Sequence, residues 1–169
     1  MVLYSRYPSP VGTLLLISDG ESLTGLSWDH NLPDNARVGD CPVLQKTGKW
    51  LDAYFSGDRP DMVLPLAPVG TDFQKRVWMR LLSIPWGQTV TYGQLARDIA
   101  GQMQKDHMSP QAVGQAVSRN PIAILIPCHR VVGCGEKLTG YAWGIEKKKW
   151  LLNHEKGNTA VKENGTCDM

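Results

Sequence analysis

The sequence predicts a mixed α/β (α+β) fold in two parts, a small antiparallel sheet with one helix and a mostly helical part after it. Short runs of strand-forming residues with tight turns lie near the N-terminus, and apolar residues then recur at helical spacing from Val43 to Phe55. A stretch rich in proline, Asp58–Gly70, separates these elements from a segment in which helix caps and helix-stopping prolines alternate. The expected parts are residues 1–70, residues 71–157 and a disordered tail, 158–169.

Three strands are predicted at the start of the first part. Residues 8–12, Pro-Ser-Pro-Val-Gly, and the pair Asp19-Gly20 have the composition of tight turns, with strand-forming residues on both sides. Strands joined by such turns form an antiparallel meander. Residues 31–40 then form a polar loop before the helix, which Ser56-Gly57 ends. The predicted strands are residues 2–7, Thr13–Ser18 and Leu23–Trp28.

Four helices are predicted in the second part, and three of them begin at a capping residue. Thr71, Thr91 and Ser109 each precede a helical pattern, where a hydroxyl accepts a hydrogen bond from the first turn. A polar loop, 101–108, joins the second and third helices in a pattern typical of a helix-turn-helix. The predicted helices are Thr71–Ile84, Tyr92 to about Ala100, Ser109 to about Arg119, and Ile145 to about Glu155, the last with Ile145, Trp150, Leu151 and Leu152 on its inner face.

Charge is divided unevenly along the chain. Residues 1–70 contain five Lys or Arg and eight Asp or Glu, whereas residues 71–157 contain twelve and six. This basic second part indicates either a surface for a polyanion or simply a solvated basic face, and charge alone does not separate the two. No apolar run approaches the roughly 18 residues of a membrane span, and the N-terminus lacks the pattern of a secretion signal. We therefore expect a cytoplasmic protein.

Cys128 is the candidate nucleophile. It follows an apolar run, Ile122–Ile126, that is predicted to be a buried strand or extended segment, and His129 and Arg130 come directly after it. Nearby cations lower a thiol pKa from about 8.5, and an imidazole can take its proton. Adjacent residues of an extended segment point opposite ways, so contact with His129 would need a turn or a bridging water. Without further evidence, a buried and inert cysteine is the more common case.

The residues around Cys128 resemble one protein family closely. Asn120–Gly133, with Pro-Cys-His-Arg-Val after an Asn-Pro pair and an apolar run, is similar to the active-site segment of the O6-alkylguanine-DNA alkyltransferases. The resemblance implies a ribonuclease-H-like first domain and a winged helix-turn-helix-like second domain that binds DNA and carries the catalytic residues. It is strong over residues 71–157, whereas the first part matches only in the order of its elements. Further similar segments are Thr71–Trp78, Ile84–Ala96, Thr139–Gly144 and Lys148–Glu155.

The resemblance implies direct-reversal repair of DNA by a single-turnover methylated-DNA–protein-cysteine methyltransferase. The alkyl group of O6-alkylguanine, or of O4-alkylthymine, passes from a base flipped out of the duplex to Cys128, once and irreversibly. His129 is then the base, acting through a water molecule, and Glu155 is the carboxylate that polarises its imidazole. Tyr92 donates a proton to N3 of the leaving guanine, and Asn120 bonds the backbone around the active-site turn.

The same resemblance assigns a pocket and a DNA-binding surface. The third predicted helix has small, almost uncharged side chains, which allow close approach to a minor groove about 6 Å wide. Phosphate contacts would make binding of double-stranded DNA independent of sequence, and we expect a monomer that needs no cofactor. The implied pocket residues are Val131, Tyr141, Ala142 and Trp143, with a backbone N–H at Ala142 facing O6. The implied DNA contacts are Ser109, Gln111, Ala112, Gln115, Arg119 and Arg130, with Arg97 and Lys105 as further candidates.

Three positions depart from the family pattern. Gln111 replaces an arginine that fills the space left by the flipped base, so no charge is added there. Trp143 replaces a glycine of many members, and we predict that its indole narrows the pocket for bulky adducts. Some members bind zinc in the first domain through cysteine and histidine pairs, but this region offers only Cys41 and His30, so we expect no metal.

Other classes of protein stay open from the sequence. A non-catalytic damage sensor of the same fold would lack the reactive cysteine, whereas Cys128 is present. A helix-turn-helix regulator with a redox-sensitive cysteine would need base-reading side chains, which the third helix lacks. A cysteine hydrolase with a Cys-His-Glu arrangement would turn over a small ester, which an alkyltransferase would not.

Overall fold

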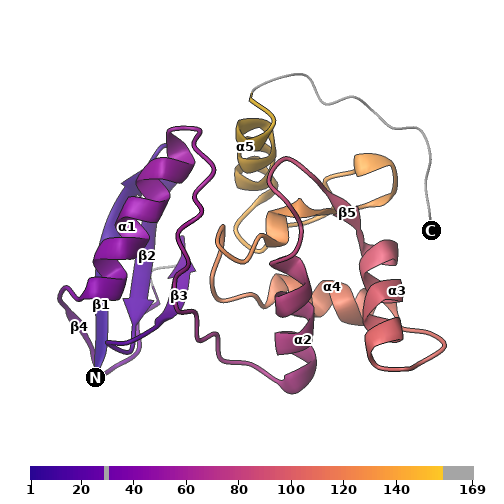
Figure 1. The fold of residues 1–169 in the computed structure, drawn as a ribbon, viewed down its shortest axis with the longest axis horizontal. Helices are drawn as coiled ribbons and strands as arrows, with labels where there is room; N and C mark the ends of the chain where they lie inside the picture. Colours follow the sequence, from indigo (N-terminus) through magenta and orange to yellow (C-terminus); the bar gives the residue numbers. More distant parts are fainter. Residues whose placement is uncertain (29–30, 158–169) are drawn as a thin grey trace. The chain divides into compact units, whose positions relative to one another are not determined.

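The computed structural model describes residues 1–28 and 31–157 (Figure 1). The chain forms two compact units, and a short segment from the second half of the sequence joins the first of them. Unit 1 is Met1–Val69 with Pro121–Ala123, and unit 2 is Gly70–Asn120 with the described residues from Ile124 onward. The tail predicted at 158–169 lies outside the described residues.

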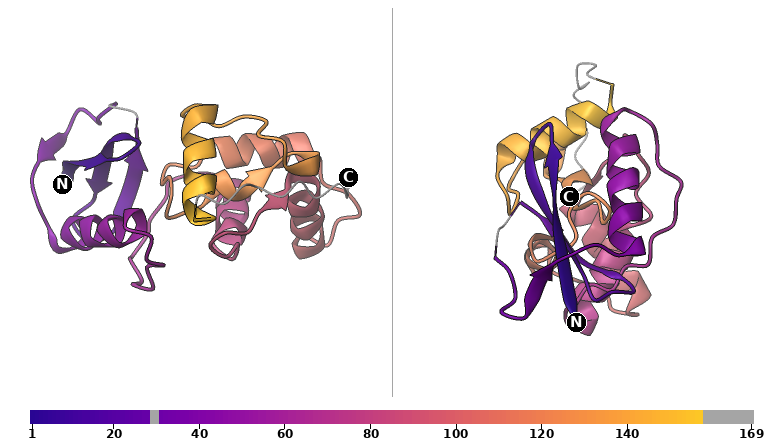
Figure 2. Two further views of the ribbon diagram at one scale, coloured as in Figure 1. Left: turned by 90° about the horizontal axis from the view of Figure 1, so that it is seen from above. Right: turned by 90° about the vertical axis from the view of Figure 1, so that its left-hand side faces the viewer.

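Unit 1 is a four-stranded sheet with one helix on one face (Figures 1 and 2). The three predicted strands form the antiparallel meander, and a fourth strand pairs parallel to the first, giving the order β3-β2-β1-β4. This fourth strand lies where the sequence predicts a polar loop. It could not be predicted, because it has only three residues, two of them exposed, and so shows no alternating pattern. The elements are β1 (Val2–Ser9), β2 (Gly12–Ser18), β3 (Leu23–Ser27), β4 (Ala36–Val38) and α1 (Pro42–Phe55).

The edge of β3 receives two distant segments of the chain. Leu66, near the end of the proline-rich stretch, bridges Leu23, and Ile122 bridges Leu26. The second bridge rests on two backbone hydrogen bonds, from Leu26 N to Pro121 O (2.9 Å) and from Ala123 N to Leu26 O (2.7 Å). The strand predicted at 122–126 is therefore wrong beyond Ile122. The segment is buried as expected, but it turns at Ile124, whose φ is +70°.

Unit 2 is mostly helical, and its helices begin where the capping residues predicted. Thr71 and Thr91 each form a reciprocal capping box with a glutamine three residues later, and Ser109 accepts from Ala112 N. The first of these helices ends before the predicted Ile84. The elements are α2 (Asp72–Leu81), β5 (Val90–Thr91), α3 (Tyr92–Gln102), α4 (Pro110–Ser118), η1 (Cys128–Arg130), β6 (Val131–Val132), η2 (Cys134–Glu136) and α5 (Ile145–Glu155).

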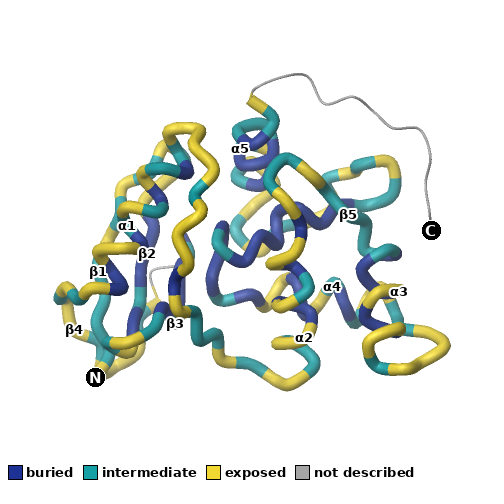
Figure 3. Tube along the Cα trace, viewed as in Figure 1, coloured by how far each residue is buried: buried dark blue, intermediate teal, exposed yellow. Residues whose placement is uncertain are grey.

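The core of unit 2 lies between α2, α3 and α4 and under the segment that leads to Cys128 (Figure 3). Trp78 is 1% exposed, and its indole N–H donates to the Ala116 carbonyl across 2.8 Å, which ties α2 to α4. A two-residue parallel ladder then pairs β5 with β6. Because α3 starts directly after β5 and Cys128 lies shortly before β6, this ladder brings the start of α3 close to Cys128.

The helices of the described residues are too short or too polar to cross a membrane. The order of the elements confirms the mixed α/β fold that the sequence predicts, since in the described part of the chain a small sheet is followed by helices.

Candidate active site around Cys128

Cys128 begins a single 3-10 turn rather than continuing an extended segment. Its backbone N–H bonds to Ile126 O (2.7 Å), and Arg130 N bonds back to Pro127 O (3.0 Å). The structure therefore contains the turn that a contact between Cys128 and His129 would need. Cys128 is 3% exposed and carries a free thiol.

Asn120 holds this turn together from inside. Its side-chain amide donates to the backbone carbonyl of Ile126 (2.8 Å), and Asn120 itself is 2% exposed. The Asn120 side chain also acts to lower the pKa of the Cys128 thiol, against the effect of burial. Asn120 thus lies where its expected role requires it, and it bridges the end of α4 to the segment before the nucleophile.

A buried carboxylate lies behind the nucleophile. Glu155, the last residue of α5, accepts a hydrogen bond from His129 Nε2 at its Oε2 (2.5 Å). Arg130 donates to both oxygens of the same carboxylate, from Nε to Oε1 (2.7 Å) and from Nη2 to Oε2 (3.1 Å). Because an ionised carboxylate only accepts, this geometry places the imidazole proton on Nε2. His129 Nδ1 is then an acceptor, and it is buried without a hydrogen-bond partner in the described residues.

Burial and pairing set the charges of this group. Burial lowers the pKa of His129 below its usual range, and Glu155 counteracts this only in part. Burial would raise the pKa of Glu155, but His129 and Arg130 outweigh it and hold that pKa well below its usual range. At neutral pH the site therefore contains a neutral imidazole with a basic Nδ1 and an ionised Glu155.

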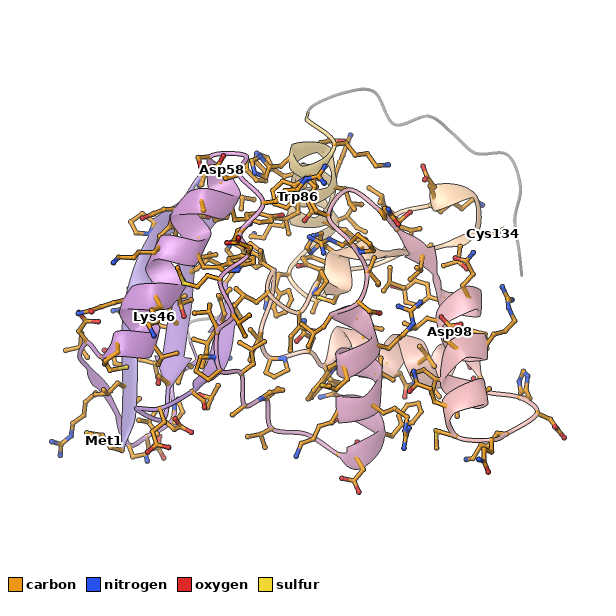
Figure 4. The ribbon with its side chains drawn as sticks, in the orientation of Figure 1. Met1, Lys46, Asp58, Trp86, Asp98 and Cys134 are labelled. Carbon is orange, nitrogen blue, oxygen red and sulfur yellow. The ribbon has the colours of Figure 1, made fainter. Side chains whose placement is uncertain are left out.

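Arg130 does not lie where a DNA contact would require it. The side chain is buried, and its guanidinium is bound by Glu155 and by the Ile84 carbonyl (2.7 Å). The DNA contact expected for Arg130 is therefore not supported, because its guanidinium binds the Glu155 carboxylate instead. Trp86, which is labelled in Figure 4, also binds Glu155. Its indole N–H donates to the backbone carbonyl of Glu155 (2.8 Å).

Cys128 opens onto a cavity of about 680 Å³ in unit 2. Tyr141 and Trp143 form one wall, with ring centroids 5.3 Å apart at 72°. Val131, an expected pocket residue, is instead fully buried in β6 and does not line the cavity. The lining residues are Tyr92, Pro110, Gln111, Gly114, Gln115, Val117, Ser118, Cys128, Thr139, Gly140, Tyr141, Ala142 and Trp143.

Tyr92 reaches the cavity from the first turn of α3. Burial raises the pKa of its phenol, and a hydrogen bond with the Thr139 side chain acts in the opposite direction. Tyr92 therefore keeps its proton at neutral pH. Thr139 had no expected role, because nothing in the sequence shows that it meets a residue 47 positions earlier.

The expected DNA-binding residues of α4 lie partly on the cavity and partly outside it. Gln111 and Gln115 are exposed and line the cavity mouth, while Ala112 is half-buried. Arg119 is exposed at the end of α4, and Ser109 is the N-cap whose hydroxyl accepts from Ala112 N. Arg97 and Lys105 line a separate hollow between α3 and the loop before α4.

Lys148 is a site residue that sequence reasoning missed. It is 0% exposed on α5, where the buried positions are Lys148, Leu151, Leu152 and Glu155. Their helical spacing could have indicated a lysine on the inner face. The predicted inner face was wrong for Ile145, which is 40% exposed, and Trp150 is only half-buried.

Burial raises the pKa of the Cys128 thiol, whereas Asn120, Tyr141 and the charge of Lys148 lower it in part. The resting thiol is therefore protonated and needs a base. Among the described residues, no group of three or more His, Cys, Asp and Glu side chains is placed to hold a metal ion. Cys41 is a free thiol in unit 1, and His30 lies outside the described residues.

Comparisons with known proteins agree with this geometry. Residues 72–157 match the DNA binding domain of 6-O-methylguanine DNA methyltransferase, and residues 2–68 match its ribonuclease-like domain. Methylated-DNA–protein-cysteine methyltransferases of Haemophilus influenzae and Methanosarcina acetivorans are each 41% identical over 90% of this chain, covering 86% and 97% of the relatives. The structure of Mycobacterium tuberculosis OGT in complex with DNA aligns with a TM-score of 0.82 and 40% identity, covering 92% of this chain and 93% of that one.

Fold, site and comparisons together define a DNA-repair methyltransferase whose methyl acceptor is one of its own cysteines. The chain belongs to the O6-alkylguanine-DNA alkyltransferase family.

Proposed function

We propose that Cys128 Sγ is the acceptor that takes the alkyl group from O6-alkylguanine in double-stranded DNA. The observation that carries this assignment is the position of Cys128. Its thiol lines a cavity of about 680 Å³ whose walls hold Tyr92 and Tyr141, while the His129 and Glu155 pair lies behind it. Cys41, the other free thiol of the described residues, lies against the Ser18 hydroxyl in unit 1.

The proton of the thiol goes to His129. Nδ1 is the free acceptor of a neutral imidazole, and it takes the proton directly or through a water molecule. Glu155 then stabilises the imidazolium, to which it is already hydrogen-bonded. The thiolate attacks the alkyl carbon, so that an S–C bond forms while the bond from carbon to O6 breaks.

Tyr92 supplies the proton that the leaving guanine needs. A phenol with a raised pKa keeps its proton at neutral pH and gives it only to a strongly basic group, here N3 of the departing base. The imidazolium of His129 then releases its proton, and the phenolate of Tyr92 takes up a proton from solvent, so that in total the thiol proton is transferred to guanine. The product is a thioether, which has no bond that water cleaves readily, so each molecule acts once.

The lesion reaches Cys128 by base flipping from the minor groove. The small side chains of α4 border the cavity, and Gln111, an exposed residue of its lining, fills the space that the base leaves in this proposal. Binding through phosphates is independent of sequence, which suits scattered lesions. O4-alkylthymine, whose alkyl group is also bound to an exocyclic oxygen of the base, is a second substrate. We further propose that the protein acts as a monomer in the cytoplasm.

The assignment is tested by incubating the chain with an excess of duplex DNA carrying O6-methylguanine and counting the methyl groups transferred. We expect one per molecule for the wild type and for Cys41→Ala, and none for Cys128→Ala. Further turnover after the first methyl would contradict the single-use reaction. Binding of damaged DNA with no transfer by the wild type would favour the sensor class instead.

A further inference from the structure

A buried lysine lies in the transfer site without a carboxylate partner. Lys148 is 0% exposed on the inner face of α5. Lysine is almost never fully buried unless it is paired, because removing an ammonium from water is costly. Among the described residues Lys148 forms no ion pair with Asp or Glu, so groups other than a carboxylate must stabilise its ammonium.

The ammonium of Lys148 contacts residues that line the cavity. Its Nζ donates to the Gly140 carbonyl (3.0 Å) and lies 5.9 Å from the centroid of the Tyr92 ring. Gly140 and Tyr92 line the same cavity as Cys128. A carbonyl and an aromatic face stabilise an ammonium without neutralising it, so its positive charge still acts on the neighbouring groups.

We propose that Lys148 is the buried cation of the transfer site, which stabilises the negative charge that forms on Cys128 Sγ when the thiol loses its proton. In this role Lys148 acts through Cys128 and not on the alkyl group or the base. It also holds Gly140 in place between the lining residues Thr139 and Tyr141. This inference rests on the assignment of Cys128 as the acceptor.

The charges around Lys148 support this role. Burial lowers the pKa of Lys148 to about 8, and Cys128 acts in the opposite direction, which couples the two groups. The Tyr92 ring faces the ammonium from α3, and the charge of Lys148 also acts on His129. On α5 itself, Glu146 and Lys149 are exposed. The ammonium is therefore largely present at pH 7 beside the residues that line the same cavity as Cys128, and within the described part of the chain it pairs with no competing carboxylate.

The proposal is tested by titrating the Cys128 thiol without DNA, through the pH dependence of its alkylation by iodoacetamide followed by peptide mass. Lys148→Gln removes the charge but keeps a donor for the Gly140 carbonyl. We expect the titration midpoint to rise by at least one pH unit, with alkylation at pH 7 at least tenfold slower. Lys149→Gln, on the exposed side of the same helix, should match the wild type.

Lys148→Arg, which keeps the charge, should titrate closer to the wild type than Lys148→Gln does, and circular dichroism should show each variant to be folded. A folded Lys148→Gln with the wild-type midpoint would overturn the proposal and leave Lys148 a packing role. If that variant does not fold, the same midpoint in Lys148→Arg and in Lys148→Met would overturn it. Because this titration needs no DNA, its outcome is separate from that of the methyl-transfer assay.

Discussion

Two buried residues, His129 and Glu155, make the chemistry of this site depend on pH through their shared hydrogen bond. The imidazole is neutral because burial disfavours its charged form, and the carboxylate is ionised because His129 and Arg130 bind it. Both native pKa values lie below those of the unfolded chain, so the unfolded state binds more protons as the pH falls.

Stability should therefore fall as the pH drops below about 6.5, the ordinary pKa of histidine, and fall further below about 4.3, that of glutamate. The stability that each of these two residues contributes is fully present above the pKa that the residue has in the unfolded chain. It is lost as the pH falls through the lower pKa that the residue has in the folded protein. Urea unfolding at pH 7.5, 6.0 and 5.0 measures the effect. His129→Gln should reduce the loss in free energy of unfolding between pH 7.5 and pH 6.0. His107→Gln, at an exposed position, should leave that loss unchanged. Equal slopes in both variants would contradict the assignment.

Trp143 should control which adducts enter the cavity. Its indole packs against Tyr141 in the wall of the cavity, where glycine would leave space. We expect Trp143→Gly to react several-fold faster with free O6-benzylguanine, while its rate with O6-methylguanine in DNA changes little. The rates follow from the loss of active Cys128 over time. A faster reaction of the wild type with O6-benzylguanine would contradict this role.

Among the elements, the 3-10 turn at Cys128 depends on residues far from it in sequence. The helices of unit 2 were predictable because their caps, such as Thr71 and Ser109, are local signals. The turn was not, since it depends on the Asn120 amide and on the pairing of β5 with β6. Lys148 was missed for a related reason, because its partners Gly140 and Tyr92 lie on other segments.

Asn120→Ala should therefore weaken both the turn and the reaction. The Ile126 carbonyl would lose its donor, and a buried unsatisfied group costs about 1–3 kcal/mol. We expect a loss of that size in the free energy of unfolding and a methyl-transfer rate at least tenfold lower. Gln102→Ala, at an exposed position at the end of α3, is the control. An unchanged rate in folded Asn120→Ala would show that the turn does not need this hydrogen bond.

For the whole molecule, the charge distribution separates the two parts of the chain. Residues 71–157 carry twelve Lys or Arg against six Asp or Glu, and these residues include the whole described site. The sequence shows this excess of basic residues, but it does not show which of their side chains are exposed and so able to contact DNA. Arg130 proved to be buried against Glu155, whereas Arg119 is exposed at the end of α4.

Arg119→Ala should weaken the binding of undamaged and damaged duplexes alike, because a phosphate contact carries no sequence information. The slope of log binding constant against log salt should become shallower by about 1. Fluorescence anisotropy at salt concentrations from about 50 to about 200 mM measures that slope, because phosphate contacts weaken strongly over this range. Lys46→Ala, on α1, should not change it. An unchanged slope in Arg119→Ala would remove Arg119 from the interface.

The proposed reaction depends above all on one covalent bond, between Cys128 Sγ and the alkyl carbon. The most direct measurement is peptide mass mapping of the wild-type chain after a single exposure to duplex DNA containing O6-methylguanine. We expect one methyl group, on Cys128 within the peptide around Asn120–Gly133, and an unmodified Cys41. A methyl group on any other residue, or none on Cys128 while the DNA is repaired, would contradict the central claim.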